Sequence, residues 1–128
     1  MFRNKRFEVF VDELSPYDSK NILDVGGSSE TWLGTGFEHK VTLLNLTKPK
    51  ERDIKKKFKA IQANALNMHM YKENEFDIVF SNSVIEHVGD RANQKRFAEE
   101  VKRVGECYWV QTPNRHFPME PHFLFPFF

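Results

Sequence analysis

Residues 21–34 read NILDVGGSSETWLG, an apolar run that ends on a carboxylate and is followed by two glycines, two serines and an acidic residue. The apolar run is short and predicts a buried strand. The glycines allow the backbone to bend tightly and a ligand to approach it closely. The serines are suited to cap a brief helix that stops at Gly34. This stretch therefore predicts a strand, a ligand-facing turn and a helix.

Outward from this stretch, four further apolar segments predict strands. They are 40–46 (KVTLLNL), 58–62, which is the weakest, 76–81 (FDIVFS) and 107–112 (CYWVQT). Helical spacing of apolar residues predicts helices over 7–14 and 91–104, the second capped by Asp90 and closed by Gly105. The lysine-rich stretch 47–60 between two strands predicts an irregular solvated link with Glu51–Lys55 and Asp53–Lys57 ion pairs; a phosphate-binding patch is the alternative.

Length and composition indicate one soluble domain. The chain has 128 residues, of which 40% are hydrophobic and 29% charged, a balance unlike that of disordered chains. The net charge of +1 gives no argument for nucleic acid or a membrane surface, and no run is long enough to span a bilayer. The lone cysteine, Cys107, fits a reducing compartment and an inert core thiol, so we expect a cytoplasmic protein. Apolar strands that alternate with crossover segments predict an α/β domain with a mostly parallel sheet and helices on both faces.

Small or polar side chains follow each predicted strand. Ligands of open parallel sheets bind at the carboxyl ends of the strands, so these residues outline one crevice. They are Asp24, Gly26 and Gly27, then Asn45, then Asn64 and Ala65, then Ser81, Asn82, Glu86 and His87, and finally Thr112, Pro113 and Asn114.

Five ordered motifs, ILDVGG, VTLLNL, ANALNM, FDIVFSNSVIEHV and YWVQTPN, resemble those of class I S-adenosylmethionine-dependent methyltransferases, the type 11 group in particular. The resemblance runs from about residue 21 to 114 and implies a Rossmann-like sheet. The usual seven-stranded fold of that family continues with a helix and two strands, which are missing from this sequence. The resemblance also implies S-adenosylmethionine as the cofactor.

The resemblance assigns roles to individual residues. Asp24 would hold the glycine turn and the amino group of the cofactor, and Asn45 would take the ribose hydroxyls. Asn64 and Ala65 would contact the adenine, while Ser81 and Asn82 would line the path to the acceptor. Together with Gly26 and Gly27, these are the expected cofactor-binding residues. Asn64 has an alternative role as a turn former in the left-handed conformation.

Three departures from the family pattern are visible. Ser28 and Glu30 stand where later glycines are common, and Asn45 and Asn64 stand where carboxylates are usual. An amide still donates to and accepts from a hydroxyl, but without the charge-assisted bond of a carboxylate. Ser83 occupies the position of an extra Glu in metal-dependent relatives, so we expect no metal.

Two histidines, His87 and His116, are candidate bases for an acceptor that must lose a proton. The expected acceptor-side residues are Glu86, Arg115, Glu120 and His122. Simpler alternatives are a solvent-facing helix start for Glu86 and His87, and a structural loop for 114–123. A zinc site of His116, Glu120 and His122 would be short of ligands.

We expect one partial methyltransferase domain over 1–128, with a lead-in helix over 1–20 and an acceptor-side loop and Phe-rich tail over 115–128. The expected function is methyl transfer to an O, N or C nucleophile of a small molecule. The alternatives are a truncated, non-catalytic domain that binds cofactor or a partner, and a nicotinamide-dependent dehydrogenase, whose G-x-G-x-x-G fingerprint is absent. The tail would pack back on the sheet, line an acceptor pocket, contact a missing C-terminal segment or join a homo-oligomer.

Overall fold

The structure, a computed structural model, describes residues 8, 12, 20–82, 84 and 88–111. The sheet has five strands in the order β3-β2-β1-β4-β5, and every neighbouring pair is parallel. The strands are β1 (Ile22–Val25), β2 (Val41–Asn45), β3 (Lys59–Gln62), β4 (Phe76–Asn82) and β5 (Gly105–Gln111). The predicted α/β fold with a parallel, Rossmann-like sheet is confirmed. Of the predicted helix over 7–14 the structure describes residues 8 and 12 alone, and the tail over 115–128 lies outside the described residues.

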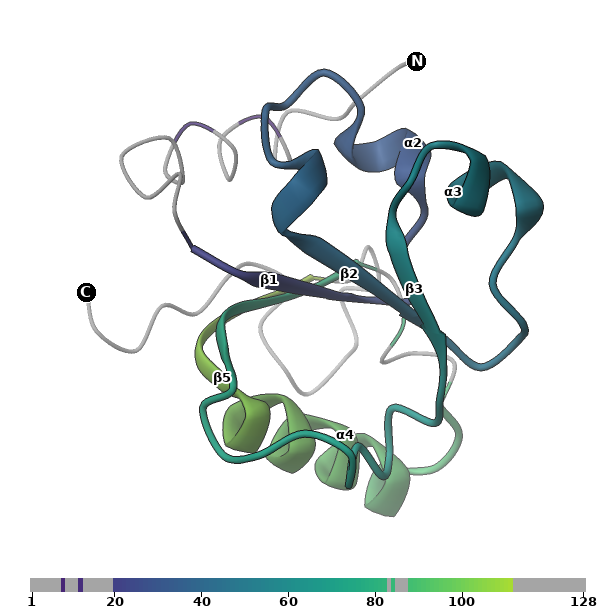
Figure 1. The fold of residues 1–128 in the computed structure, drawn as a ribbon. Helices are drawn as coiled ribbons and strands as arrows, with labels where there is room; N and C mark the ends of the chain where they lie inside the picture. The colour runs from purple at the N-terminus through teal and green to yellow at the C-terminus, as the bar shows by residue number, and fades with distance from the viewer. Residues whose placement is uncertain (1–7, 9–11, 13–19, 83, 85–87, 112–128) are drawn as a thin grey trace.

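Helices cover both faces of the sheet (Figure 1). The short helices α2 (Ser29–Trp32) and α3 (Glu51–Lys55) lie on one side, and the long helix α4 (Arg91–Val104) lies on the other. A 3-10 turn, η2 (Glu38–Lys40), leads into β2. The order of strands reverses between β1 and β4, because β2 and β3 extend the sheet to one side of β1 and β4 and β5 to the other.

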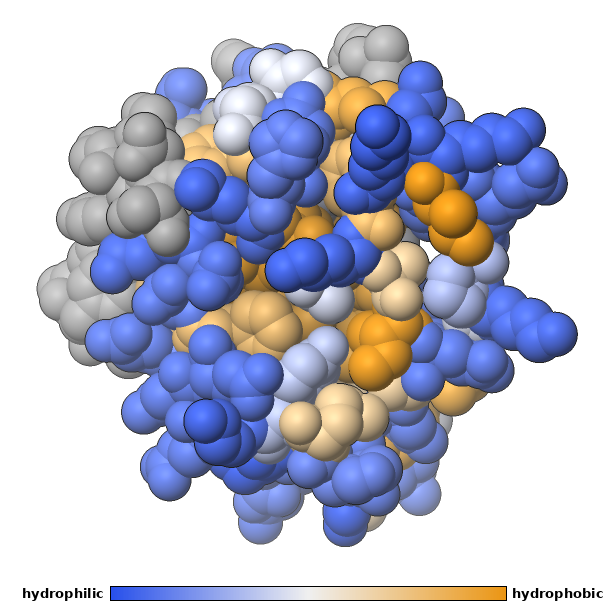
Figure 2. All heavy atoms as spheres, in the orientation of Figure 1, coloured by the Kyte–Doolittle hydropathy of each residue, from blue (hydrophilic) through white to orange (hydrophobic). Residues whose placement is uncertain are grey.

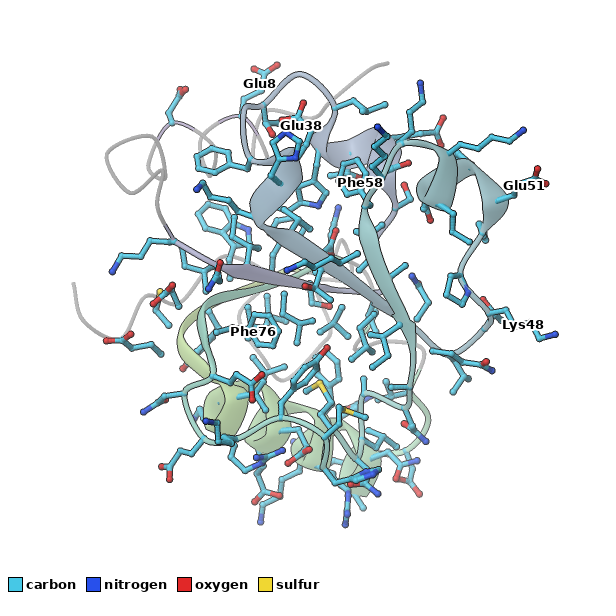
Figure 3. All side chains as sticks on the ribbon, viewed as in Figure 1. Glu8, Glu38, Lys48, Glu51, Phe58 and Phe76 are labelled. Atoms are coloured by element: carbon cyan, nitrogen blue, oxygen red, sulfur yellow. The ribbon has the colours of Figure 1, made fainter. Side chains whose placement is uncertain are left out.

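Two apolar cores separate the sheet from its helices. On the side of α2 and α3, Trp32 and Phe80 meet edge to face with ring centroids 5.3 Å apart. On the side of α4, the helix places Phe97 against the sheet. Figure 3 shows the division directly, since Phe58 lies above the sheet and Phe76 below it. Alternate residues of each strand thus serve opposite cores, as expected for a doubly covered parallel sheet.

The lysine-rich link is more ordered than the sequence suggested. It contains α3, and Lys55 pairs with Glu51 at 3.2 Å, as predicted. The predicted Asp53–Lys57 pair is wrong, because Asp53 is buried and bonds to other groups. Lys57 has a φ of 64°, which turns the chain out of the helix before a further i, i+4 pair forms.

Helix α4 begins and ends as its sequence predicts. The Asp90 carboxylate accepts a hydrogen bond from the backbone N–H of Asn93 at 2.9 Å, so it caps the helix. Gly105 follows the last helical residue in extended conformation and is already the first residue of β5. The strand therefore starts two residues earlier than the apolar run from Cys107 indicated.

Hydrophilic residues cover most of the face in Figure 2, and apolar side chains form a band across its middle. Among the described residues, the exposed large apolar side chains are those of Leu46, Ile54 and Met70, and a few such residues are normal on a protein surface. Within the described part of the chain, helices are too short or too polar to cross a membrane.

Candidate functional site

A hollow of about 370 Å³ lies at the carboxyl ends of β1 and β2, beside the loop that follows β3. We call it the carboxyl-end hollow. Four of the predicted cofactor-binding residues line it, namely Gly26, Asn45, Asn64 and Ala65. Its apolar lining comes from Val25, Leu44, Leu46, Ala63, Leu66, Val84 and Val88. The four predicted residues span 39 positions of the sequence, from Gly26 to Ala65, and share one concave surface.

The glycine turn, Gly26–Gly27, requires both of its glycines. Gly26 has a φ of +80°, and a Cβ at this position would lie 2.3 Å from Cγ2 of Val84. The Gly26 N–H donates to the carbonyl of Leu44 at 2.7 Å, which ties the turn to β2. A Cβ on Gly27 would lie 1.7 Å from Oδ2 of Asp24. The turn therefore leaves no room for a side chain on the side of Val84 or on the side of Asp24.

Asp24 supports the turn from beneath and is not part of the lining of the hollow. Its side chain is 1% exposed, and the indole N–H of Trp32 donates to Oδ2 at 2.7 Å. Burial raises the pKa of Asp24 from 3.8 to about 7, although the hydrogen bond from Trp32 lowers it in part. The contact with Gly27 fits the expected role in holding the turn, and the bond to a cofactor amino group stays a prediction.

Asn45 connects the end of β2 to the glycine turn. Its Nδ2 donates to the carbonyl of Gly27 at 2.9 Å. One further N–H and the amide oxygen complete the hydrogen-bonding groups of the side chain. Asn45 is half-buried and lines the hollow, so it is placed to meet a ligand while it holds the turn.

Asn64 shapes the loop after β3. Its Oδ1 accepts from the backbone N–H of Leu66 at 2.8 Å, an Asx turn. The left-handed conformation considered for Asn64 is wrong, because the positive φ values outside glycine belong to Lys57 and Asn74 among the described residues. Asn64 therefore forms an Asx turn while its backbone φ stays negative.

Polar side chains of α4 anchor this loop, a contribution that the sequence analysis missed. Arg96 donates to the carbonyl of Leu66 at 2.7 Å, and Arg103 donates to the carbonyl of Met68 at 2.9 Å. Glu100 accepts from the N–H of Met68 at 2.5 Å. The helix thus fixes one wall of the hollow through its charged face. The i, i+3 spacing of Glu100 and Arg103 was visible in the sequence, but their backbone partners were not.

Ser81 and Asn82 lie at the end of β4 and outside the lining of the hollow. Ser81 is fully buried, and its hydroxyl donates to the carbonyl of Val25 at 3.1 Å. It therefore bonds β4 to the strand that carries the glycine turn. Asn82 is exposed. The remaining predicted site residues, Glu86, His87, Arg115, His116, Glu120 and His122, lie outside the described residues.

A second support lies under α2. The carboxylate of Asp53 accepts from the N–H of Ser29 at 3.0 Å and from Nε of Arg52 at 3.1 Å. Burial acts to raise the pKa of Asp53, but the hydrogen bonds from Ser29 and Arg52 outweigh it and hold the pKa below 3.8. Arg52 also pairs with Glu30 at 3.0 Å. Helix α3 therefore fixes the start of α2, directly after the glycine turn.

Two other features are less suited to be the site. A hollow of about 460 Å³ lies at the amino ends of β2 and β3, where Lys59 is among its lining residues, and none of the predicted site residues lines it.

Cys107 is buried, and burial raises the pKa of its thiol to about 12, which suits an inert core residue. Among the residues that the structure describes, no cluster of three His, Cys, Asp or Glu side chains is placed to hold a metal ion.

Comparison with known proteins identifies the class. The "Methyltransferase domain" family matches residues 23–106, so the chain belongs to the class I S-adenosylmethionine-dependent methyltransferases of type 11. Two curated relatives, the uncharacterized proteins Rv1509 and MT1557 of Mycobacterium tuberculosis strains, are each 41% identical over 56 residues. That match covers 44% of this chain and 19% of each relative.

Solved structures share the fold. YcgJ of Bacillus subtilis is similar with a TM-score of 0.63 and 18% identity, over 82% of this chain and 49% of that one. An S-adenosylmethionine-dependent methyltransferase of Clostridium acetobutylicum also gives a TM-score of 0.63, at 11% identity, over 85% of this chain and 50% of that one. The methyltransferase CalH, solved in complex with SAH, gives 0.60 at 10% identity, over 80% of this chain and 34% of that one. The chain therefore spans about half the length of these structures or less.

Proposed function

We propose that this chain binds S-adenosylmethionine in the carboxyl-end hollow and that the protein transfers its methyl group to a small-molecule acceptor. The observation that carries the proposal is the convergence of Gly26, Asn45, Asn64 and Ala65 on one hollow of about 370 Å³. This volume falls within the range of small-molecule sites, roughly 300–1,000 Å³. The family match supports the same cofactor.

The lining suits such a molecule. Gly26 lines the hollow with its backbone alone, so a ligand in the hollow is able to contact the turn directly. Asn45 and Asn64 offer amide groups for hydroxyl and amino groups. Leu46, which is 71% exposed, and Val88 supply apolar surface for the face of an aromatic base.

The cofactor supplies an activated methyl group on a sulfonium centre, and the protein has to align an acceptor with it. We assign this alignment to the acceptor-side residues predicted from the sequence, Glu86, Arg115, Glu120 and His122. His87 and His116 are the proposed bases for an acceptor that must lose a proton. Asp24 and Asn45 hold the glycine turn, which keeps the hollow open.

Isothermal titration with S-adenosylmethionine and with SAH tests the proposal. We expect one site, and Asn64→Ala should weaken it about tenfold or more because it removes both the Asx turn and an adenine contact. Gly26→Val should abolish binding, since its Cβ overlaps Val84. Lys59→Ala, in the hollow at the opposite ends of the strands, is the matched control and should leave the affinity unchanged. A folded sample that binds neither compound at millimolar concentration would overturn the proposal.

A further inference from the structure

The two amides that line the carboxyl-end hollow are used in opposite senses. Asn45 acts as a donor, from Nδ2 to the carbonyl of Gly27 at 2.9 Å. Asn64 acts as an acceptor, through Oδ1 from the N–H of Leu66 at 2.8 Å. An ionised carboxylate accepts hydrogen bonds and donates none. A carboxylate in place of each amide would therefore preserve the bond that Asn64 makes and would lose the one that Asn45 makes.

We propose that Asn45 is a positioning residue that fixes the glycine turn through its donated hydrogen bond, so that an amide is required at this position. A carboxylate, which the family resemblance leads one to expect here, would displace the Gly27 carbonyl and weaken cofactor binding. The part that concerns the cofactor rests on the proposed function. The part that concerns the turn rests only on the contacts of this chain.

The end of β2 holds the turn at two successive residues. The carbonyl of Leu44 accepts from the N–H of Gly26, and the next residue, Asn45, donates to the carbonyl of Gly27. Glycine has the largest backbone freedom of all residues, so a two-glycine turn gains most from such restraints. The amide oxygen of Asn45 then remains as an acceptor for a ligand hydroxyl. The N45D substitution would instead place negative oxygens against the Gly27 carbonyl, and only the protonated form of the new carboxyl would regain a donor.

The groups around Asn45 allow this effect to be isolated. The described residues that line the hollow carry no titratable side chain. Asp24 contacts Gly27, and Asp53, Arg52 and Glu30 pair beneath α2. All four remain in every variant. Because Asp24 contacts Gly27 and its pKa of about 7 lies in the tested range, the comparison is repeated in a D24N background, which removes its coupling to position 45.

The test compares N45D, N45A and N64D with the wild-type chain. Urea unfolding and SAH titration are measured from about pH 4.5 to about pH 7.5. Because the reference pKa of an aspartate is about 3.9 and the Gly27 carbonyl favours the protonated form, the carboxyl introduced by N45D should titrate in the lower part of this window. At the upper end we expect N45D to bind SAH about tenfold or more weakly than the wild type, and to unfold at lower urea than N45A. N64D should bind within about threefold of the wild type, because its acceptor is retained.

The pH profile separates a positioning role from a general loss of packing. N45D should recover toward the wild type as the pH falls, in both unfolding midpoint and SAH affinity, whereas the deficit of N45A should stay constant. An N45D variant that matches or exceeds the wild type near pH 7.5, or whose deficit is as flat as that of N45A, would overturn the proposal. If the wild type fails to bind SAH, the proposed function fails, and the unfolding profiles still decide whether Asn45 holds the turn.

Discussion

Asp24→Asn should change how stability depends on pH, because Asp24 carries a carboxyl group in the core directly below the glycine turn. The pKa of Asp24 is about 7 in the folded chain, against an ordinary value of 3.8. A group whose folded pKa is raised binds more protons in the folded than in the unfolded state between these values. Its contribution to stability is therefore complete below about pH 4 and is lost as the pH rises to about 7.

The size of the effect follows from the shift. Each pH unit of difference between the folded and unfolded pKa corresponds to about 1.4 kcal/mol, so a shift of about three units gives about 4 kcal/mol. An amide at position 24 is always neutral and keeps an acceptor for the Trp32 indole. The free energy of unfolding of the wild type minus that of D24N should thus fall by about 4 kcal/mol between about pH 4 and about pH 8.

Urea unfolding followed by far-UV circular dichroism across this range gives both free energies. Asp53, Glu38 and Glu100 have lowered pKa values and stabilise the fold as the pH rises, but they are common to both proteins and cancel in the difference. Trp32→Phe removes a bond that lowers the pKa of Asp24, so it should move the loss of stability to higher pH. A difference between wild type and D24N that is flat within about 1 kcal/mol would refute the reasoning.

Three further outcomes are expected. Gly27→Ala should cost about 2–3 kcal/mol because its Cβ overlaps the carboxylate beneath, whereas Gly36→Ala, at a φ of +88° with open space around it, should cost only about 1 kcal/mol in urea unfolding. Asp53→Ala should cost about 1–3 kcal/mol near neutral pH by leaving the N–H of Ser29 unpaired, and progressively less as the pH falls below 3.8 and the carboxyl becomes protonated; a cost that does not change between neutral pH and strong acid would contradict this. Cys107, with its pKa of about 12, should react with a thiol reagent only in denaturant, and rapid labelling of the native chain would contradict its burial.

The strands were predictable because their signal is local. Val41–Asn45 and Phe76–Asn82 are short, mostly apolar runs, which are typical of a strand that is covered on both faces. The turn was predictable because glycine has no side chain and allows a tight bend. The Asp90 cap was equally local, since it bonds to a residue three positions away. These features need no knowledge of the tertiary structure.

The supports of the site could not be predicted, since they depend on contacts between distant residues. Asp53 bonds to a residue 24 positions earlier, and Arg103 to a carbonyl 35 positions earlier. From the sequence alone, the lysine-rich stretch 47–60 and the charged face of α4 are both predicted to be solvent-exposed surfaces. The raised pKa of Asp24 likewise comes from burial, which only the assembled core provides.

The two walls of the carboxyl-end hollow are held in physically different ways. The glycine turn packs against the buried carboxyl of Asp24 on β1, and the carbonyl of Gly27 accepts a hydrogen bond from the amide of Asn45 on β2. The loop after β3 is held from α4, where charged side chains bond to three of its carbonyls, at Leu66, Met68 and Tyr71. Charge-assisted bonds to a loop backbone are stronger than neutral ones, whereas a two-glycine turn has to be restrained by close packing. The amides at positions 45 and 64 therefore have different structural roles. Asn45 belongs to the wall of the glycine turn and donates through Nδ2, whereas Asn64 belongs to the loop after β3 and accepts through Oδ1.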